Sequence, residues 1–233
     1  QEIFKTGQQD QIALKRNPKK YRGSFSIMNL AANGEIWSGK GKKNIRYYDL
    51  NQENLSGYQN ENTKSLAIRI AYGPFRYYTG GDISGCLLDS AGNSVDLEEK
   101  VAEACGPVDV CKANHHAYKD AMSDGFVRNI QARNYVISTW DYEHTQPEIL
   151  SRMVSEDLYA GKRNVFSTYI PEFMRKAYAD EEWMRSVCPE NGHVVVKVYD
   201  KGRKYKIYIL SATEEDYNVK AIYGPFESGK GMK

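Results

Sequence analysis

The sequence predicts an α/β layered fold, because strand-like runs alternate with helical patterns over residues 62–160. Short runs rich in β-branched and aromatic residues occur at 65–72, 75–79, 108–112 and 134–140. Apolar residues at helical spacing follow the last two runs, over 123–130 and from Pro147 onward. This alternation is typical of a sheet whose faces are covered by helices.

The first third of the chain has the pattern of strands and turns. Residues 25–30 form a strand candidate, and Ala-Asn-Gly at 32–34 is a hairpin signal before a returning strand at 35–37. Residues 39–62 are polar and rich in Gly, Asn and Gln, so we expect a long loop there.

Three helices are predicted from their starting residues. Residues 96–104 have an acidic first half, which favours a helix N-terminus. Ser123 is an N-cap candidate for a helix with an apolar face, and Pro147 suits the first turn of the next helix. That last helix places apolar residues at helical spacing, namely Ile149, Leu150, Met153, Val154 and Leu158.

The last forty residues change character. Residues 194–199 and 203–210 flank Asp-Lys-Gly and form a clear β-hairpin pattern, and 218–223 is a further strand. We expect this β-rich tail, at about 190–233, to extend the sheet of a single domain that covers residues 1–233.

The composition is that of an ordinary globular chain. Of 233 residues, 41% are hydrophobic and 27% are charged, and the net charge of +2 excludes strong global attraction of a polyanion. Residues 1–50 carry ten Lys and Arg against four Asp and Glu, which is either a phosphate-facing surface or a solvated basic face. No apolar run reaches the roughly 18 residues that a membrane span requires.

The four cysteines and the first residues bear on cell compartment and chain boundaries. No Cys-x-x-Cys pair occurs, so we expect buried or free thiols, as in a reducing compartment such as the cytoplasm, although one disulfide stays open. The chain starts at Gln1 without a signal-peptide pattern and reads like the middle of a protein, so we expect a trimmed chain.

Two short segments are the strongest functional signal. Residues 78–82 (Tyr-Thr-Gly-Gly-Asp) and 110–116 (Val-Cys-Lys-Ala-Asn-His-His) each end an apolar strand-like run. A carboxylate and an imidazole at two strand ends are suitable metal ligands in an α/β scaffold. The ordinary alternatives are a turn aspartate that caps its own backbone at Asp82, and core or surface histidines at 115 and 116.

Four segments in this order resemble a known family. Residues 62–65 (Asn-Thr-Lys-Ser) precede a strand, 79–82 (Thr-Gly-Gly-Asp) follow it, 114–117 (Asn-His-His-Ala) come about thirty residues later, and His144 shortly precedes Pro147. Over roughly residues 20–210, this pattern is similar to the C-terminal half of the metallo-β-lactamase superfamily. The most similar branch contains the hydrolase domain of bacterial competence proteins, which take up DNA.

The resemblance implies a fold, a reaction and cofactors. The fold would be the C-terminal portion of an αββα sandwich, and the function that of the C-terminal portion of a metal-dependent hydrolase acting on phosphodiesters or other esters. Two metal ions would bind in the complete protein, with zinc expected and manganese or iron also suited to Asp and His ligands. The implied partners are an upstream half of the same domain and a nucleic acid or other phosphoester.

The chain also departs from the family. The His-x-His-x-Asp-His motif is absent, which predicts little or no activity for this chain alone and leaves open a non-catalytic binding or structural module with a degenerate metal site. Ala117 stands where the family has Gly, and Pro147 is displaced relative to His144.

The resemblance assigns metal binding to Asp82, as a bridging ligand, and to the His pair. If the strand continues through the pair, His115 and His116 point to opposite faces. We therefore expect His115 to face Asp82 as a ligand and His116 to pack or to support the ligands from behind. His144 is the candidate catalytic residue, oriented by Asp141, with a helix-start histidine as the equal alternative. We expect Asp82, His115 and His144 to lie together at one sheet edge.

Overall fold

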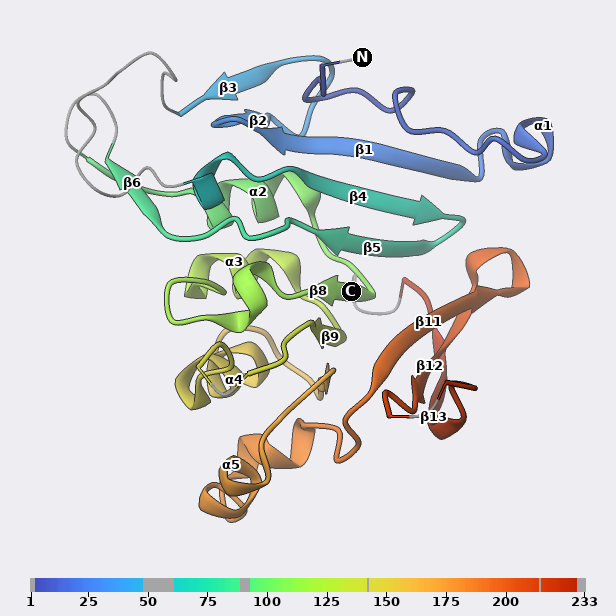
Figure 1. Cartoon of the computed structure of the whole chain (residues 1–233). Helices are drawn as coiled ribbons and strands as arrows, with labels where there is room; N and C mark the ends of the chain where they lie inside the picture. The colour runs from blue at the N-terminus through green and yellow to red at the C-terminus, as the bar shows by residue number, and fades with distance from the viewer. Residues whose placement is uncertain (1–2, 48–60, 89–92, 142, 214, 230–233) are drawn as a thin grey trace.

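The computed structural model describes residues 3–47, 61–88, 93–141, 143–213 and 215–229, and its main element is one large mixed sheet flanked by helices. The sheet has eight strands in the order β10-β9-β8-β5-β4-β1-β2-β3 (Figure 1). Its strands are β1 (Phe25–Ala32), β2 (Glu35–Trp37), β3 (Asn44–Arg46), β4 (Ala67–Tyr72), β5 (Phe75–Thr79), β8 (Val110–Lys112), β9 (Asn134–Ile137) and β10 (Asn164–Ser167). The α/β class predicted from the sequence is therefore confirmed.

The strand directions decide where the site lies. Strands β5, β8, β9 and β10 pair in parallel, whereas β1 to β5 pair through antiparallel ladders. Parallel strands need crossover connections, and helices supply them here. The carboxyl ends of β5, β8 and β9 consequently meet at one edge of the sheet, and the loops that leave them come together there.

One face of the sheet is covered by helices. These are α2 (Leu97–Cys105), α3 (Asp124–Ile130) and α4 (Pro147–Val154), whose buried residues share a core with Tyr78, Cys111 and Tyr135 of the sheet. These three helices begin where the sequence predicts. The side chains of Asp96 and Ser123 cap the N-termini of α2 and α3, and α4 begins at Pro147. The remaining helical segments are α1 (Pro18–Tyr21), α5 (Glu172–Ala177), η1 (Glu61–Lys64), η2 (Asn114–Ala117), η3 (Glu182–Ser186) and η4 (Asp200–Gly202).

The β-rich tail covers the other face near β8, β9 and β10. It is a separate three-stranded sheet of β11 (His193–Tyr199), β12 (Lys204–Leu210) and β13 (Val219–Glu227), so the expectation that it extends the main sheet is wrong. Tyr205, Ile207 and Ile209 of β12 pack in a second core with Val110 and Val136 of the main sheet. Val110 and Cys111 are consecutive and enter opposite cores, which is the alternation of a strand buried on both faces.

Several local expectations need correction. The predicted loop at 39–62 contains β3, which pairs with β2, and residues 48–60 of that loop lie outside the described residues. A short hairpin of β6 (Cys86–Leu88) and β7 (Ser94–Asp96) precedes α2 and was not anticipated. Cys105, Cys111 and Cys188 are buried free thiols, as expected. Within the described parts of the chain, no helix is both long and apolar enough to cross a membrane.

Candidate functional site

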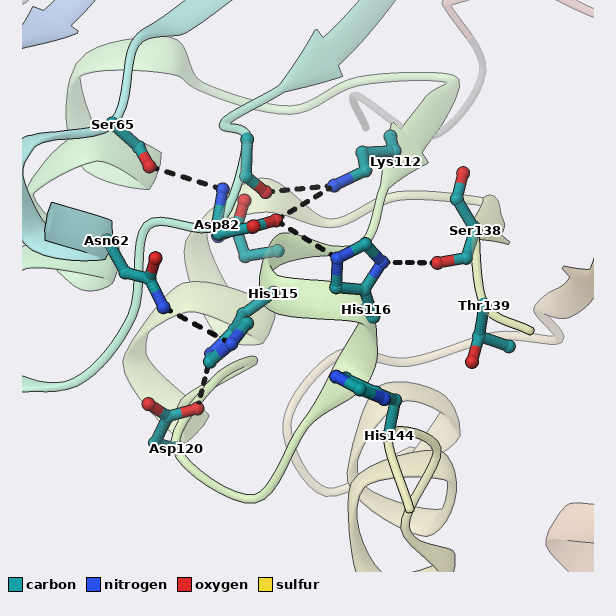
Figure 2. A network of polar contacts seen from close by, with 12 residues as sticks. Asn62, Ser65, Asp82, Lys112, His115, His116, Asp120, Ser138, Thr139 and His144 are labelled. Carbon is teal, nitrogen blue, oxygen red and sulfur yellow. Dashed lines mark hydrogen bonds and ion pairs between the residues drawn. The ribbon is translucent and has the colours of Figure 1, made fainter. Parts of the chain in front are cut away.

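The candidate site lies where β5, β8 and β9 end, and Figure 2 shows its side chains converging from separate segments of the chain. Asp82 follows β5, His115 and His116 follow β8, and His144 lies in the loop between β9 and α4. The ring centroids of the three histidines are 6.2 Å (His115 to His116), 5.3 Å (His116 to His144) and 6.5 Å (His115 to His144) apart. The expected grouping at one sheet edge is therefore what the structure has.

Asp82 faces His116 and not His115. The Nε2 atom of His116 lies 3.4 Å from Oδ1 of Asp82 (Figure 2). The other ring nitrogen, Nδ1, donates to the backbone carbonyl of Ser138. Because that carbonyl only accepts, Nδ1 carries a proton and Nε2 is the nitrogen that is available toward the carboxylate.

Both ring nitrogens of His115 already have partners. Its Nδ1 is 2.8 Å from Oδ1 of Asp120, and its Nε2 is 3.2 Å from Nδ2 of Asn62 (Figure 2). An Asp accepts and an Asn amide nitrogen donates, so the ring has a proton on Nδ1 and an engaged lone pair on Nε2. In this arrangement His115 links η1 to the loop after β8 and has no free nitrogen for Asp82.

The expected orientations of the two histidines toward Asp82 are thus reversed, and the physical reason is where β8 ends. The strand stops at Lys112, and residues 114–117 form the short 3₁₀ turn η2. His115 and His116 both have left-handed backbone angles, with φ of 42° and 57°, and Ala117 continues this at 60°. The alternation of a strand does not apply to such a turn, so both rings point toward the same edge of the sheet.

The turn that holds Asp82 is close-packed. A Cβ on Gly80 would meet Oη of Tyr78 at 2.1 Å and Oδ1 of Asn114 at 2.5 Å, so no side chain fits there. The backbone N–H of Asp82 donates to Oγ of Ser65 at 3.3 Å (Figure 2). The Thr-Gly-Gly-Asp and Asn-x-x-Ser segments noted in the sequence therefore contact each other across the site.

Lys112 supplies a positive charge beside the carboxylate. Its Nζ donates to the carbonyl of Gly81 at 2.9 Å and lies 3.8 Å from Oδ1 of Asp82. Burial lowers the pKa of Lys112, and the neighbouring Asp82 opposes that shift. The side chain of Lys112 lies within the site and is only 15% exposed.

His144 is held by Asp141, as the sequence reasoning expected. Its Nδ1 is 2.7 Å from both carboxylate oxygens of Asp141, which also accepts the backbone N–H groups of Glu143 and His144. The hydrogen bond from the His144 ring is the main cause that lowers the pKa of Asp141. The proton on Nδ1 is thereby fixed, and Nε2 is left for the site.

Three contributors to the site escaped the sequence reasoning. Asp120 orients His115 and is recognisable only by its spacing of five residues along the chain. The Ser138 carbonyl orients His116, and a backbone group leaves no sequence signal. Trp140 is 71% exposed, and its ring centroid lies 5.4 Å from that of His116, so an aromatic side chain stands at the rim. Neither the exposure of Trp140 nor its contact with His116 can be read from the sequence.

The described residues do not form a metal site by themselves. No group of three or more His, Cys, Asp and Glu side chains in the described ranges is arranged to hold a metal ion. The Asp82 and His116 pair does have a suitable spacing, because two donor atoms that each lie ~2.1 Å from one tetrahedral zinc are about 3.4 Å apart.

No protein-family model matches the chain, and no curated protein is found to be similar to it.

Proposed function

We propose that Asp82 and His116 are part of the metal centre of a hydrolase that acts on phosphodiesters or other esters. The observation that supports this most directly is the approach of the available Nε2 of His116 to Oδ1 of Asp82, at 3.4 Å. When Nε2 carries no proton, two acceptor atoms face each other, which is unfavourable unless a cation lies between them. Carboxylate oxygen and imidazole nitrogen suit zinc, and also manganese or iron.

Each remaining residue has a role that follows from its contacts. The Ser138 carbonyl keeps the proton on Nδ1 of His116, which leaves Nε2 as the donor atom toward a metal ion. A metal bound there would supply an activated hydroxide and a Lewis acid. His144 has its Nδ1 proton fixed by Asp141, so its Nε2 is the group that would exchange a proton with the leaving oxygen of an ester.

The proposal includes an incomplete ligand set. Two protein donors bind a divalent ion weakly, so further ligands have to come from outside the described residues. The resemblance in the sequence points to the upstream half of a metallo-β-lactamase-like sandwich as their source. We therefore expect this chain alone to hydrolyse a generic phosphodiester very slowly.

A specific observation favours a second candidate, a non-catalytic binding or structural module with a degenerate site. The described ranges contain no cluster of three ligand side chains. In that case Asp82 and a protonated His116 form an ordinary ion pair that holds two loops together. The two candidates differ in whether a divalent ion competes for the pair.

Proton NMR with Mn²⁺ distinguishes the hydrolase from the structural module, because this paramagnetic ion broadens the signals of nearby histidine rings even when binding is weak. The chain has four histidines, so each ring can be assigned by substitution. We expect the His116 signals to broaden first, those of His144 and His115 next, and those of His193 in β11 last. His116→Ala or Asp82→Asn should abolish the effect on the other site rings, whereas His115→Ala should keep it.

One outcome would contradict the hydrolase proposal, and another would contradict the argument that the ligand set is incomplete. Equal broadening of all four histidine rings would mean that Mn²⁺ has no site at the Asp82 and His116 pair, which leaves the structural module. Rapid turnover of bis(p-nitrophenyl) phosphate by the purified chain, lost on chelation, would show that the ligand set is complete and that the incomplete-site argument is wrong.

A further inference from the structure

Glu98 has a buried carboxyl group that the proposed chemistry does not use. It lies in the first turn of α2 and is 1% exposed. Its Oε1 accepts from Nδ2 of Asn114 at 2.7 Å and from the backbone N–H of Met122 at 2.8 Å, and its Oε2 accepts from the backbone N–H of Ser123 at 3.0 Å. A buried carboxyl group whose oxygens accept three hydrogen bonds is costly to replace by a group that lacks acceptors.

The three donors bracket the loop that carries the site. Asn114 is the first residue of η2, and Met122 and Ser123 are the last residues before α3. Between them lie His115, His116 and Asp120, each of which contacts another site residue. Glu98 therefore holds both ends of a loop whose middle faces the site.

This loop needs such support because its backbone is strained. His115, His116, Ala117 and Met122 all have positive φ, between 42° and 60°, although none is glycine. Left-handed angles are unfavourable for a non-glycine residue, because its Cβ crowds the backbone, and they persist only where the surroundings fix them. Glu98 bonds directly to Met122, one of the four, and to Asn114, the neighbour of another.

We propose that Glu98 is a positioning residue, which clamps the two ends of the loop and so keeps Nε2 of His116 directed at Asp82. The expected effect of Glu98 on metal binding at His116 rests on the proposed function. The clamp itself is a statement about the His116 ring and does not depend on any metal.

The hydrogen-bond pattern predicts a graded response to substitution. In Glu98→Gln, the amide oxygen can still accept from Asn114 and Met122, while the amide nitrogen faces the N–H of Ser123, and that bond is lost. Glu98→Ala removes all three acceptors. Glu103→Gln is the matched control, because Glu103 is an exposed residue of the same helix and its carboxylate pairs with Lys100.

The first experiment is proton NMR of the metal-free chain, with the His116 ring signals and their nuclear Overhauser contacts as readout. We expect Glu98→Gln to shift these signals and weaken the contacts to the Ser138 region, Glu98→Ala to do so more strongly, and Glu103→Gln to match the wild type. A folded Glu98→Gln chain with wild-type His116 signals and contacts would overturn the proposal, even if it were less stable.

The second experiment repeats the Mn²⁺ titration on the same variants. Residues that support metal ligands from behind typically change metal affinity by 10–100-fold, so we expect about a tenfold higher Mn²⁺ requirement for His116 broadening in Glu98→Gln. Unchanged Mn²⁺ sensitivity in folded Glu98→Gln, where the wild type responds, would also overturn the clamp. If wild-type His116 does not respond to Mn²⁺ at all, the proposed function fails, while the metal-free NMR result still decides the role of Glu98.

Discussion

His116 directs its Nε2 at Oδ1 of Asp82 across 3.4 Å, although the two residues lie 34 positions apart in the sequence (116 − 82). Asp82 follows β5 and His116 follows β8, and these neighbouring strands run in parallel. The pairing of β5 with β8 therefore brings the two residues together. Of the two adjacent histidines, His116 faces the carboxylate of Asp82 and His115 does not.

His115 should matter for stability and little for metal binding. Its ring links Asn62 of η1 to Asp120 through both nitrogens. His115→Ala should lower the free energy of unfolding by about 1–3 kcal/mol. It removes two hydrogen bonds and leaves the partly buried side chains of Asn62 and Asp120 without their histidine partner. Urea unfolding measures this, with His193→Ala as control. A variant that keeps its stability but loses the Mn²⁺ response would reverse our assignment of the pair.

Gly80 should tolerate no side chain. The added methyl group of Gly80→Ala would lie within 2.1 Å of Oη of Tyr78, so the Asp82 turn or Tyr78 has to move. We expect a loss of about 1–3 kcal/mol, as for other overpacked positions, and displaced Asp82 signals in NMR. Gly81→Ala is the comparison. A Cβ at residue 81 would lie 3.4 Å from the nearest side-chain atoms of Ser65, which is an ordinary contact, so the loss of stability comes only from the φ of 60°. An equal or smaller loss for Gly80→Ala would contradict the steric argument.

The pairing of His144 with Asp141 should be visible in the titration of the aspartate. The His144 ring lowers the pKa of Asp141 mainly through their hydrogen bond. His144→Ala should raise the pKa of Asp141 toward its ordinary value of 3.8, as followed by carbon NMR of the side-chain carboxyl group. His115→Ala should leave the Asp141 titration unchanged. No change in His144→Ala would mean that the two side chains are not paired in solution.

Glu98 should make the chain less stable as the pH rises. Burial raises its pKa from 4.5 to about 8 in the folded chain, against the opposing effect of its three N–H donors. Since Glu98 then holds more protons in the folded chain than in the unfolded chain between these values, its contribution to stability is largest below pH 4.5 and is lost as the pH rises to about 8. Each pH unit in this window contributes up to about 1.4 kcal/mol.

The difference between two stability curves isolates this effect. Glu98→Gln cannot ionise, so its urea midpoint should fall less between pH 5 and pH 8, a span of roughly three units of the linkage window. Glu103→Gln should follow the wild type, because its carboxylate is on the surface. Parallel curves for wild type and Glu98→Gln would show that Glu98 does not titrate in this range.

Local signals in the sequence predicted much of the fold. Ser123, Pro147 and the hairpin of β11 and β12 were identified correctly because caps, prolines and tight turns act through neighbouring residues. Strand β3 was missed, since Asn44–Arg46 is short and polar, and its pairing with β2 is decided by the tertiary structure. The separate sheet formed by the tail was also missed, because the tertiary structure decides which sheet a strand joins.

The candidate site was predicted in position but not in detail. Strand ends at 79 and 112 were enough to bring Asp82 and the His pair to one edge. The orientation of His115 and His116 depends on left-handed backbone angles at residues that are not glycine, and composition gives no cue for those. Glu98 escaped because a buried carboxylate in the first turn of a helix looks like any acidic helix start.

The parallel ladders between β5, β8 and β9 also have a kinetic meaning. They join segments that are distant along the chain, with Tyr78 opposite Cys111 and Cys111 opposite Tyr135. Closing such non-local pairs is slow compared with forming a helix or a hairpin. The site draws on residues from Asn62 to His144, so we expect it to assemble only after these ladders close. Because the Ser138 carbonyl that orients His116 follows β9, we expect an opening that releases β9 to disrupt the site even where β1 to β5 stay paired.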